Sequence, residues 1–207
     1  MENSSKYDRI IDAFQELLEN EDIQHISVNQ IAQKAGIGKG SIYYYFSSKN
    51  DILKALIKKI YTNTIILAET LTLQTNISSS IRIAQIFNSC RSASFEFIRK
   101  SENFKTKKAT VGSIYDSAFI HQQFMSHIIS ELKPYFTEII KQGIAVGEVN
   151  FEYPAELAEI ILIVLTVKID NTLSPSSEEE ITNSLQALIS LLEKGTNNEL
   201  GAFHLRA

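Results

Sequence analysis

The stretch SVNQIAQKAGIGKGSIYYYF, residues 27–46, decides the fold of this chain. Ser27 can accept a hydrogen bond from the amide three residues on, and Gln30 can reach back to the Ser27 amide, which is the pattern of a capping box at a helix start. Gly36 supplies the positive φ that a sharp turn between two helices requires. The spacing therefore predicts two short helices joined by a turn of three or four residues.

A small apolar cluster is expected to hold these two helices together. Its members lie on both sides of the turn, and they are Ile31, Ala32, Ala35, Ile37, Ile42 and either Tyr45 or Phe46. Successive helix positions turn by about 100°, so three consecutive tyrosines cannot all face this cluster. We expect Tyr45 and Phe46 to be more buried and Tyr43 and Tyr44 to be more exposed. Simple core packing is the alternative for the tyrosine run.

The residues before this stretch predict one more helix, over about 5–20. Ser5 with Asp8 is a plausible helix start, and apolar side chains recur at helical spacing after it, at Ile10, Phe14, Leu17 and Leu18. Residues 1–48 are therefore expected to form a three-helix domain that contains a helix-turn-helix.

The rest of the chain has helical periodicity and no strand signal, so the predicted fold class is all-α. Ser48 with Asp51 predicts a helix start, and that helix extends to about residue 72. Further helices are expected over about 80–100, near 104–111, over 117–146 with a kink at Pro134, over 155–171, and from Ser176 or Ser177 to Gly195. We therefore expect a second, helical domain over 49–195 and a mobile tail over 196–207.

Charge is distributed unevenly along the chain. The net charge of the 207 residues is −4, but residues 34–59 hold six lysines and one aspartate, a net charge of +5. Residues 150–207 contain nine carboxylates and only three basic residues. Phosphate binding depends on local rather than total charge, so the lysine-rich segment is consistent with a nucleic-acid surface. A solvated lysine face on a helix explains the same pattern and is the alternative.

Several other classes of protein find no support in the sequence. The one cysteine, Cys90, cannot form an internal disulfide, and neither a secretion signal nor a run of 18 apolar residues is present, so we expect a cytoplasmic protein without membrane contact. His121 and His127 would point about 240° apart on a helix and could not chelate one metal ion together. No catalytic constellation and no dinucleotide fingerprint stands out, so we expect no enzyme, no cofactor and no metal.

The segment AGIGKGSIYYYFSSKNDIL, residues 35–53, resembles the tetracycline-repressor (TetR/AcrR) family. The family pattern is an Ala-Gly turn, a Ser-Lys-Gly-Thr-like helix start, Leu-Tyr-x-Tyr-Phe, and then a lysine and an acidic helix start. The close match covers residues 5–60; beyond it, only the length and the helical character agree. The resemblance implies an N-terminal DNA-binding domain and a C-terminal domain for effector binding and dimerisation. Gly38 departs from the pattern, because the family usually has a polar side chain there that can contact DNA.

The second helix of such a motif enters the major groove, with its N-terminal end against base edges and phosphates. Lys39 is long enough to reach a guanine edge, and Gly40 lets the backbone approach a phosphate closely. Lys49, at the next helix start, is similar to the lysine with which the family binds the DNA backbone. The predicted DNA-binding residues are Ser27, Lys39, Gly40, Ser41, Tyr43, Tyr44 and Lys49.

Aromatic residues gather in the region where the family has its regulatory pocket. A largely apolar effector pocket is therefore expected among Phe87, Cys90, Arg91, Phe95, Phe104, Tyr115, Phe119 and Phe124. Without the resemblance, these aromatic residues would be interpreted as core. Arg91 lies at the edge of its helix's apolar stripe, where it could pair with an anionic ligand or extend into solvent.

The last two predicted helices are typical of a dimer interface. Residues 160–167 are apolar on nearly all sides, which is more than a surface helix needs. The family is similar in pairing two such helices with those of a second copy. The predicted interface residues are Ile160, Ile161, Val164, Leu185, Leu188 and Leu192.

Taken with the resemblance, these features predict a homodimer that binds a palindromic operator, represses transcription and is released by a small, largely apolar effector. A protein of the same fold that activates transcription or organises DNA without an effector is the alternative, and a filled C-terminal core would favour it. An all-helical enzyme is the remote alternative.

Overall fold

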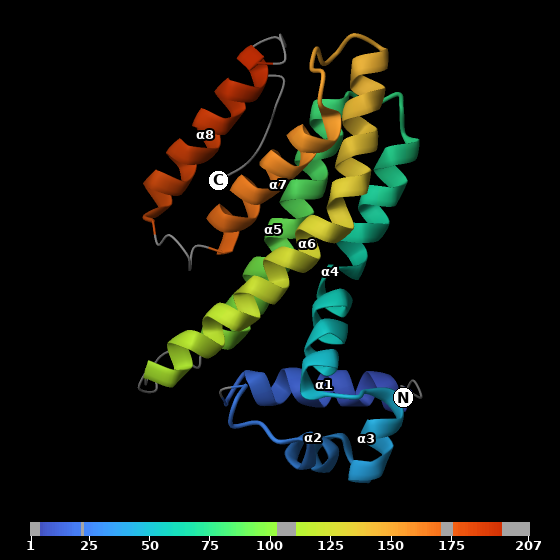
Figure 1. The fold of residues 1–207 in the computed structure, drawn as a ribbon, viewed down its shortest axis with the longest axis vertical. Coiled ribbons are helices and arrows are strands. Elements are labelled where there is room, and N and C mark those ends of the chain that lie inside the picture. Colours follow the sequence, from blue (N-terminus) through green and yellow to red (C-terminus); the bar gives the residue numbers. More distant parts are fainter. Residues whose placement is uncertain (1–4, 22, 103–110, 171–175, 196–207) are drawn as a thin grey trace. The chain divides into compact units, whose positions relative to one another are not determined.

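The computed structural model describes residues 5–21, 23–102, 111–170 and 176–195, and within these ranges it contains helices and no strands. The predicted all-α fold class is confirmed. The helices, coloured along the chain in Figure 1, are α1 (Lys6–Leu18), α2 (Val28–Ala35), α3 (Lys39–Tyr45), α4 (Lys49–Leu73), α5 (Ser79–Glu102), α6 (Val111–Ala145), α7 (Pro154–Asp170) and α8 (Glu178–Gly195). None of the helices in the described ranges combines the length and the apolar character that crossing a bilayer requires.

Local capping signals explain where the first helices begin and end. The Ser27 hydroxyl accepts from the Gln30 amide at 3.2 Å, and the Gln30 side chain accepts from the Ser27 amide at 2.8 Å, so the predicted capping box is present. Gly36 closes α2 with a left-handed φ of 63°. The Ile37 amide then donates to the Ala32 carbonyl at 3.0 Å, a bond that turns the chain sharply toward α3.

The core of this helix-turn-helix largely matches the predicted apolar cluster. Its buried members, from the three helices and the C-cap of α3, are Ile10, Phe14, Ile31, Ala32, Ala35, Ile42 and Phe46. Ile37 is only half-buried, and Tyr45 retains 38% of its surface, so neither belongs to the centre of the core. Tyr45 instead meets Tyr7 of α1 edge to face, and Tyr7 stacks on Phe46 with a centroid distance of 4.9 Å.

The later helices also begin at predicted signals, with one exception. The Asp51 amide donates to the Ser48 hydroxyl at 3.2 Å, and the Glu180 amide donates to the Ser177 hydroxyl at 3.3 Å. The exception is α6, which begins at Val111, earlier than the predicted residue 117, and continues through Pro134. The short helix predicted near 104–111 falls on residues 103–110, outside the described ranges, apart from Val111 itself. The predicted mobile tail over 196–207 lies outside them as well.

The chain divides into two compact units. The N-terminal unit consists of Met1–Ile60 with Glu96–Gln123, and the C-terminal unit consists of Tyr61–Phe95 with Phe124–Ala207. Helix α4 therefore contributes residues to both units. The division of the sequence at residue 48 stays a prediction. Below, "the head" means the described residues of 5–60, which hold α1, α2, α3 and the first part of α4.

Candidate nucleic-acid interface

Helix α3 exposes most of its side chains. Tyr44 retains 83% of its surface and Tyr43 retains 53%, whereas Ile42 is buried at 1%. Positions three and four apart share a face of a helix, so Gly40, Tyr43 and Tyr44 lie on one face, and Lys39 is one turn from Tyr43. The sequence prediction that Tyr43 and Tyr44 are more exposed than Tyr45 and Phe46 is confirmed.

The start of α3 has unusually open surroundings. Gly38 caps the helix with extended backbone angles (φ −70°, ψ 144°) and makes no side-chain cap hydrogen bond. A Cβ added at Gly38 or at Gly40 would meet no protein atom within 4 Å. Packing within the head therefore does not require glycine at either position. Ser41 is half-buried.

Ser27 lies at the opposite end of the motif and is exposed, but its hydroxyl already has partners. It accepts from the Gln30 amide and donates to the Gln30 side-chain oxygen at 2.8 Å. Gln30 in turn donates to Glu21 at 3.0 Å. A contact from Ser27 to a phosphate would add to a formed capping box, and it would occur beside a carboxylate.

Lys49, the first residue of α4, points into the head. Its ammonium group donates to the carbonyl of Ile26 at 2.9 Å and also contacts the carbonyl of Ile23, both in the segment that precedes α2. An ammonium group has three donors, so these two carbonyls occupy most of its hydrogen-bonding capacity. Sequence reasoning missed this role, because the partners lie 23 and 26 residues away.

Carboxylates of α1 pair with some of the lysines that gave the segment 34–59 its positive charge. Lys34 lies 2.7 Å from the carboxylate of Glu16, and Lys59 pairs with Asp12. All four side chains are substantially exposed, so these pairs contribute little to stability, but they reduce the local positive potential. Lys39 and Lys54 are exposed lysines of the same segment.

The predicted effector-pocket residues are only partly described. Phe87, Cys90 and Phe124 are buried, and Arg91 is half-buried. Burial raises the pKa of the Cys90 thiol to about 12, against a smaller opposing effect of a hydrogen bond with Ser94. The predicted side chains outside the described part of the structure are those of Phe95, Phe104, Tyr115 and Phe119.

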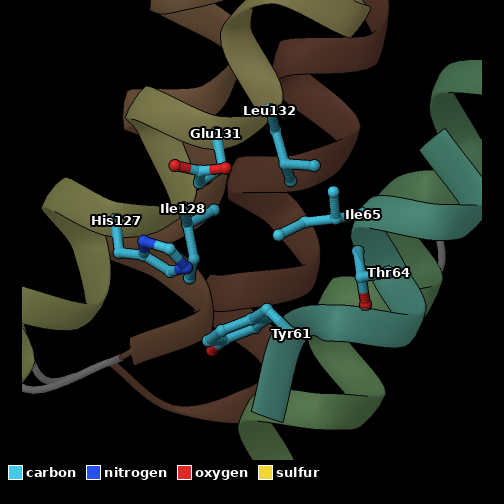
Figure 2. A pocket seen from close by; sticks show the side chains of 7 residues that line it. All are labelled: Tyr61, Thr64, Ile65, His127, Ile128, Glu131 and Leu132. Carbon is cyan, nitrogen blue, oxygen red and sulfur yellow. The ribbon is translucent and has the colours of Figure 1, made fainter. Parts of the chain in front are cut away.

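A narrow pocket lies between α4 and α6 of the C-terminal unit (Figure 2). Its volume is about 170 Å³, including space open to solvent, and its lining residues are Tyr61, Thr64, Ile65, His127, Ile128, Glu131 and Leu132. The Tyr61 hydroxyl lies 2.5 Å from the Ser94 hydroxyl, and its ring meets Phe124 edge to face. Pockets for drug-sized ligands span about 300–1,000 Å³, so this space is small for such a ligand.

The predicted dimer residues divide into buried and exposed sets. Four of them are buried within the single chain, namely Ile161, Leu185, Leu188 and Leu192, and Val164 is half-buried. Ile160 retains 54% of its surface, and two residues that the sequence prediction omitted, Ile163 and Leu191, retain 43% and 69%. Helices α7 and α8 lie side by side in the C-terminal unit (Figure 1). The interface itself stays a prediction.

Among the described residues, no group of three or more His, Cys, Asp or Glu is placed to hold a metal ion. The exposed helix α3 of the head offers an ammonium group, tyrosine hydroxyls and main-chain groups for hydrogen bonding.

Comparison with known proteins agrees with this arrangement. Residues 10–56 match the family model described as bacterial regulatory proteins, tetR family, and residues 100–190 match a tetracyclin repressor-like C-terminal domain. Over 54 residues the chain is 43% identical to the fatty acid metabolism regulator protein of Bacillus subtilis, and over 64 residues it is 34% identical to the HTH-type transcriptional regulator YvdT of the same organism. These matches cover 26% and 31% of this chain, and only 28% and 33% of the respective relatives.

Solved structures resemble the chain over nearly its whole length. SmeT, the repressor of a multidrug efflux pump of Stenotrophomonas maltophilia, has a TM-score of 0.63 and 10% identity, covering 99% of this chain and 96% of SmeT. FadR of Bacillus subtilis, solved with stearoyl-CoA, has a TM-score of 0.58 and 19% identity, covering 96% and 100% of the two chains. At these identities the likeness shows the fold. With both family models matched in order along the sequence, this chain belongs to the tetR family of bacterial transcriptional regulators.

Proposed function

We propose that this chain is a ligand-responsive transcriptional repressor that binds a palindromic DNA operator as a homodimer. The exposed face of α3 carries the proposal: Lys39, Gly40, Tyr43 and Tyr44 lie there without being needed for the core of the head. Helices of helix-turn-helix motifs dock such a face into the major groove. Two copies related by a twofold axis would read two half-sites of a palindrome.

Each residue of this face can contact a particular group of the DNA. The Lys39 ammonium can donate to the O6 and N7 acceptors of guanine, and the tyrosine hydroxyls can donate to phosphate oxygens. Gly40 leaves room for a close main-chain approach. Ser41 of α3 and Ser27, the N-cap of α2, are assigned to phosphates.

A binding assay with duplexes selected from a random library, and with the DNA upstream of its own coding region, tests this assignment. We expect tight, salt-sensitive binding to a palindrome, because the exposed lysines of the head displace counterions from DNA. Lys39→Ala should weaken binding at least tenfold. Lys141→Ala removes an exposed lysine of α6, in the C-terminal unit, and should leave affinity unchanged. Absence of salt-sensitive binding to every duplex would overturn the proposal.

The proposed dimer buries the exposed apolar side chains of α7 and α8, which are Ile160, Ile163 and Leu191. Ile160→Glu should convert the dimer to a monomer in sedimentation experiments, because an unpaired carboxylate in an apolar interface is strongly unfavourable. Ile66→Glu is a matched control, since Ile66 of α4 is also 54% exposed in the single chain. Equal association of both variants would rule out this interface.

The proposed effector is small and largely apolar, and it binds in the C-terminal unit. This part rests on the relatives: FadR was solved with stearoyl-CoA and SmeT with triclosan. If effector binding and DNA binding are coupled by about 1–3 kcal/mol, a bound effector changes the affinity of the protein for DNA several-fold to over a hundredfold. Acyl-CoA thioesters of graded chain length, and triclosan, should be tested for a rise in Tm and for release of the selected DNA. Free coenzyme A is the control without an acyl chain.

One observation favours the alternative of a regulator without an effector. Phe87, Cys90 and Phe124 are buried, and the nearby pocket is narrow. If the selected DNA is bound but no apolar ligand raises Tm or releases it, the alternative is preferred.

A further inference from the structure

Lys49 lies at a position where its own helix does not favour a positive charge. It is the first residue of α4, and the N-terminus of a helix carries a partial positive charge. Its ammonium group turns away from that helix and binds the carbonyls of Ile23 and Ile26, whose side chains are buried in the head. The segment before α2 is thereby tied to the start of α4.

Arg9 makes the equivalent connection at the other end of α2. Its Nη2 atom, projecting from α1, donates to the carbonyl of Ala35 at 2.5 Å and to that of Gly36 at 3.2 Å. These are carbonyls of the last residue of α2 and of its left-handed cap, where a cation is favourable for the helix dipole. A Cβ at Gly36 would come within 3.0 Å of Nη2, so the glycine also provides room for the guanidinium group.

Helix α3 has few means of fixing its own position. It has seven residues, Ile42 is its one buried residue, and its N-cap makes no side-chain hydrogen bond. Its support is packing against α2, together with the edge-to-face contact of Tyr45 with Tyr7 of α1. The orientation of α3 therefore depends on how firmly α2 and the turn are held, and Arg9 and Lys49 hold the two ends of α2.

We propose that Arg9 and Lys49 are positioning residues of the DNA-binding head, which fix α2 by its flanking carbonyls and so set the orientation of α3, rather than phosphate ligands. For Lys49, this positioning role replaces the phosphate contact that the resemblance to the family implied. The inference rests on the proposed DNA-binding function. The ammonium group of Lys49 donates to two carbonyls before α2, and the guanidinium group of Arg9 donates to the carbonyls of the last residue of α2 and of its cap.

Positioning residues and phosphate ligands affect the sequence specificity and the salt dependence of DNA binding differently. A lost phosphate contact weakens binding to all duplexes alike and lowers the salt slope by about 0.9. A misoriented recognition helix loses base contacts but keeps its phosphate contacts, so only the preference for the correct sequence falls. General destabilisation lowers binding to all duplexes alike and leaves the slope unchanged.

The experiment compares Lys49→Met and Arg9→Met with wild type on the selected palindrome and on a scrambled duplex of equal length, over a salt series. We expect the ratio of the two affinities to fall about tenfold, with affinity for the scrambled duplex and its salt slope unchanged. Lys39→Met removes the proposed guanine contact and should also lower this ratio, whereas Lys141→Met should leave both the ratio and the slope unchanged.

The conservative variants Lys49→Arg and Arg9→Lys retain the charge and carry the test if a methionine variant does not fold. An arginine readily replaces a lysine at a phosphate, but its planar fork does not reproduce the ammonium contacts to two separate carbonyls. We expect Lys49→Arg to remain deficient in specificity. A reduced salt slope in Lys49→Met with full rescue by Lys49→Arg, or an equal loss on both duplexes, would overturn the inference. If wild type binds no duplex, the proposed function fails instead.

Discussion

The Nη1 atom of Arg82 lies 2.6 Å from the side-chain oxygen of Gln142, joining α5 to α6 inside the C-terminal unit. The same atom donates to the carbonyl of Leu71 near the end of α4 at 3.3 Å. Arg82 is only 2% exposed. Burial lowers the pKa of its guanidinium group, and the nearby carboxylate of Glu148 partly opposes that effect. An arginine nevertheless stays protonated in proteins, so three helices share one buried cation.

Arg82→Met should therefore destabilise the C-terminal unit. The substitution leaves the Gln142 oxygen and the Leu71 carbonyl without their charged donor, and we expect a loss of about 2–3 kcal/mol in the free energy of unfolding. Urea unfolding followed by circular dichroism measures it. Lys141→Met, at an exposed position of α6, should stay within about 0.5 kcal/mol of wild type. Comparable values for the two variants would contradict a structural role for the Arg82 contacts.

Gly143→Ala should destabilise the protein for a steric reason. A Cβ at this position would lie 2.6 Å from the Oγ of Ser79, 2.9 Å from its Cβ and 3.1 Å from a methyl of Val149. Because Ser79 is itself buried, its side chain cannot easily move away, and we expect a loss of about 1–3 kcal/mol. In a double-mutant cycle, Ser79→Ala should recover part of the loss; strict additivity would show that the two positions do not interact.

Gly40→Ala should have opposite effects on stability and on DNA binding. Gly40 lies within α3, and a Cβ there meets nothing within 4 Å, so alanine should stabilise the head by about 0.5–1 kcal/mol. Thermal unfolding checks this. The same methyl group would prevent a close approach of the α3 backbone to phosphate, so affinity for the selected palindrome should fall. Unchanged affinity would remove Gly40 from the proposed contact surface.

The Cys90 thiol should be inert in the folded protein. Burial raises its pKa to about 12, and the thiolate is the reactive form. At pH 8 about one thiol in ten thousand is then ionised, and the fraction increases only as the pH rises toward the shifted pKa. Modification by a disulfide reagent should be slow in the native state and rapid in urea, where the pKa returns to about 8.5. A fast native reaction would contradict the burial.

Features that depend on neighbouring residues could be predicted from the sequence. Ser5, Ser27, Ser48 and Ser177 all precede helices, because each cap is completed by a group only three residues away. The left-handed turn at Gly36 follows from the same short-range geometry. The more exposed Tyr43 and Tyr44 could be distinguished from Tyr45 because helical periodicity fixes which side chains share a face.

Features that depend on residues distant in the sequence could not be predicted in this way. Lys49 and its carbonyl partners are 23 and 26 residues apart, and Arg82 and Gln142 are 60 apart, so only the packed fold brings them together. Helix α6 begins at Val111, earlier than the predicted residue 117, although Gly112 and Ser113 within it are residue types with weak helix propensity. The exposed Ile163 and Leu191 were missed because periodicity finds an apolar face without saying which of its residues the chain's own core already covers.

The open surroundings of Gly38 and Gly40 have a consequence for evolution. The backbone angles at Gly38 suit any residue, and a Cβ at either position would meet no protein atom within 4 Å. Single mutations can therefore change the groups that the start of α3 presents while the head folds as before. Under the proposed DNA-binding function, a single substitution at Gly38 can then change the groups offered to an operator without a loss of stability in the head.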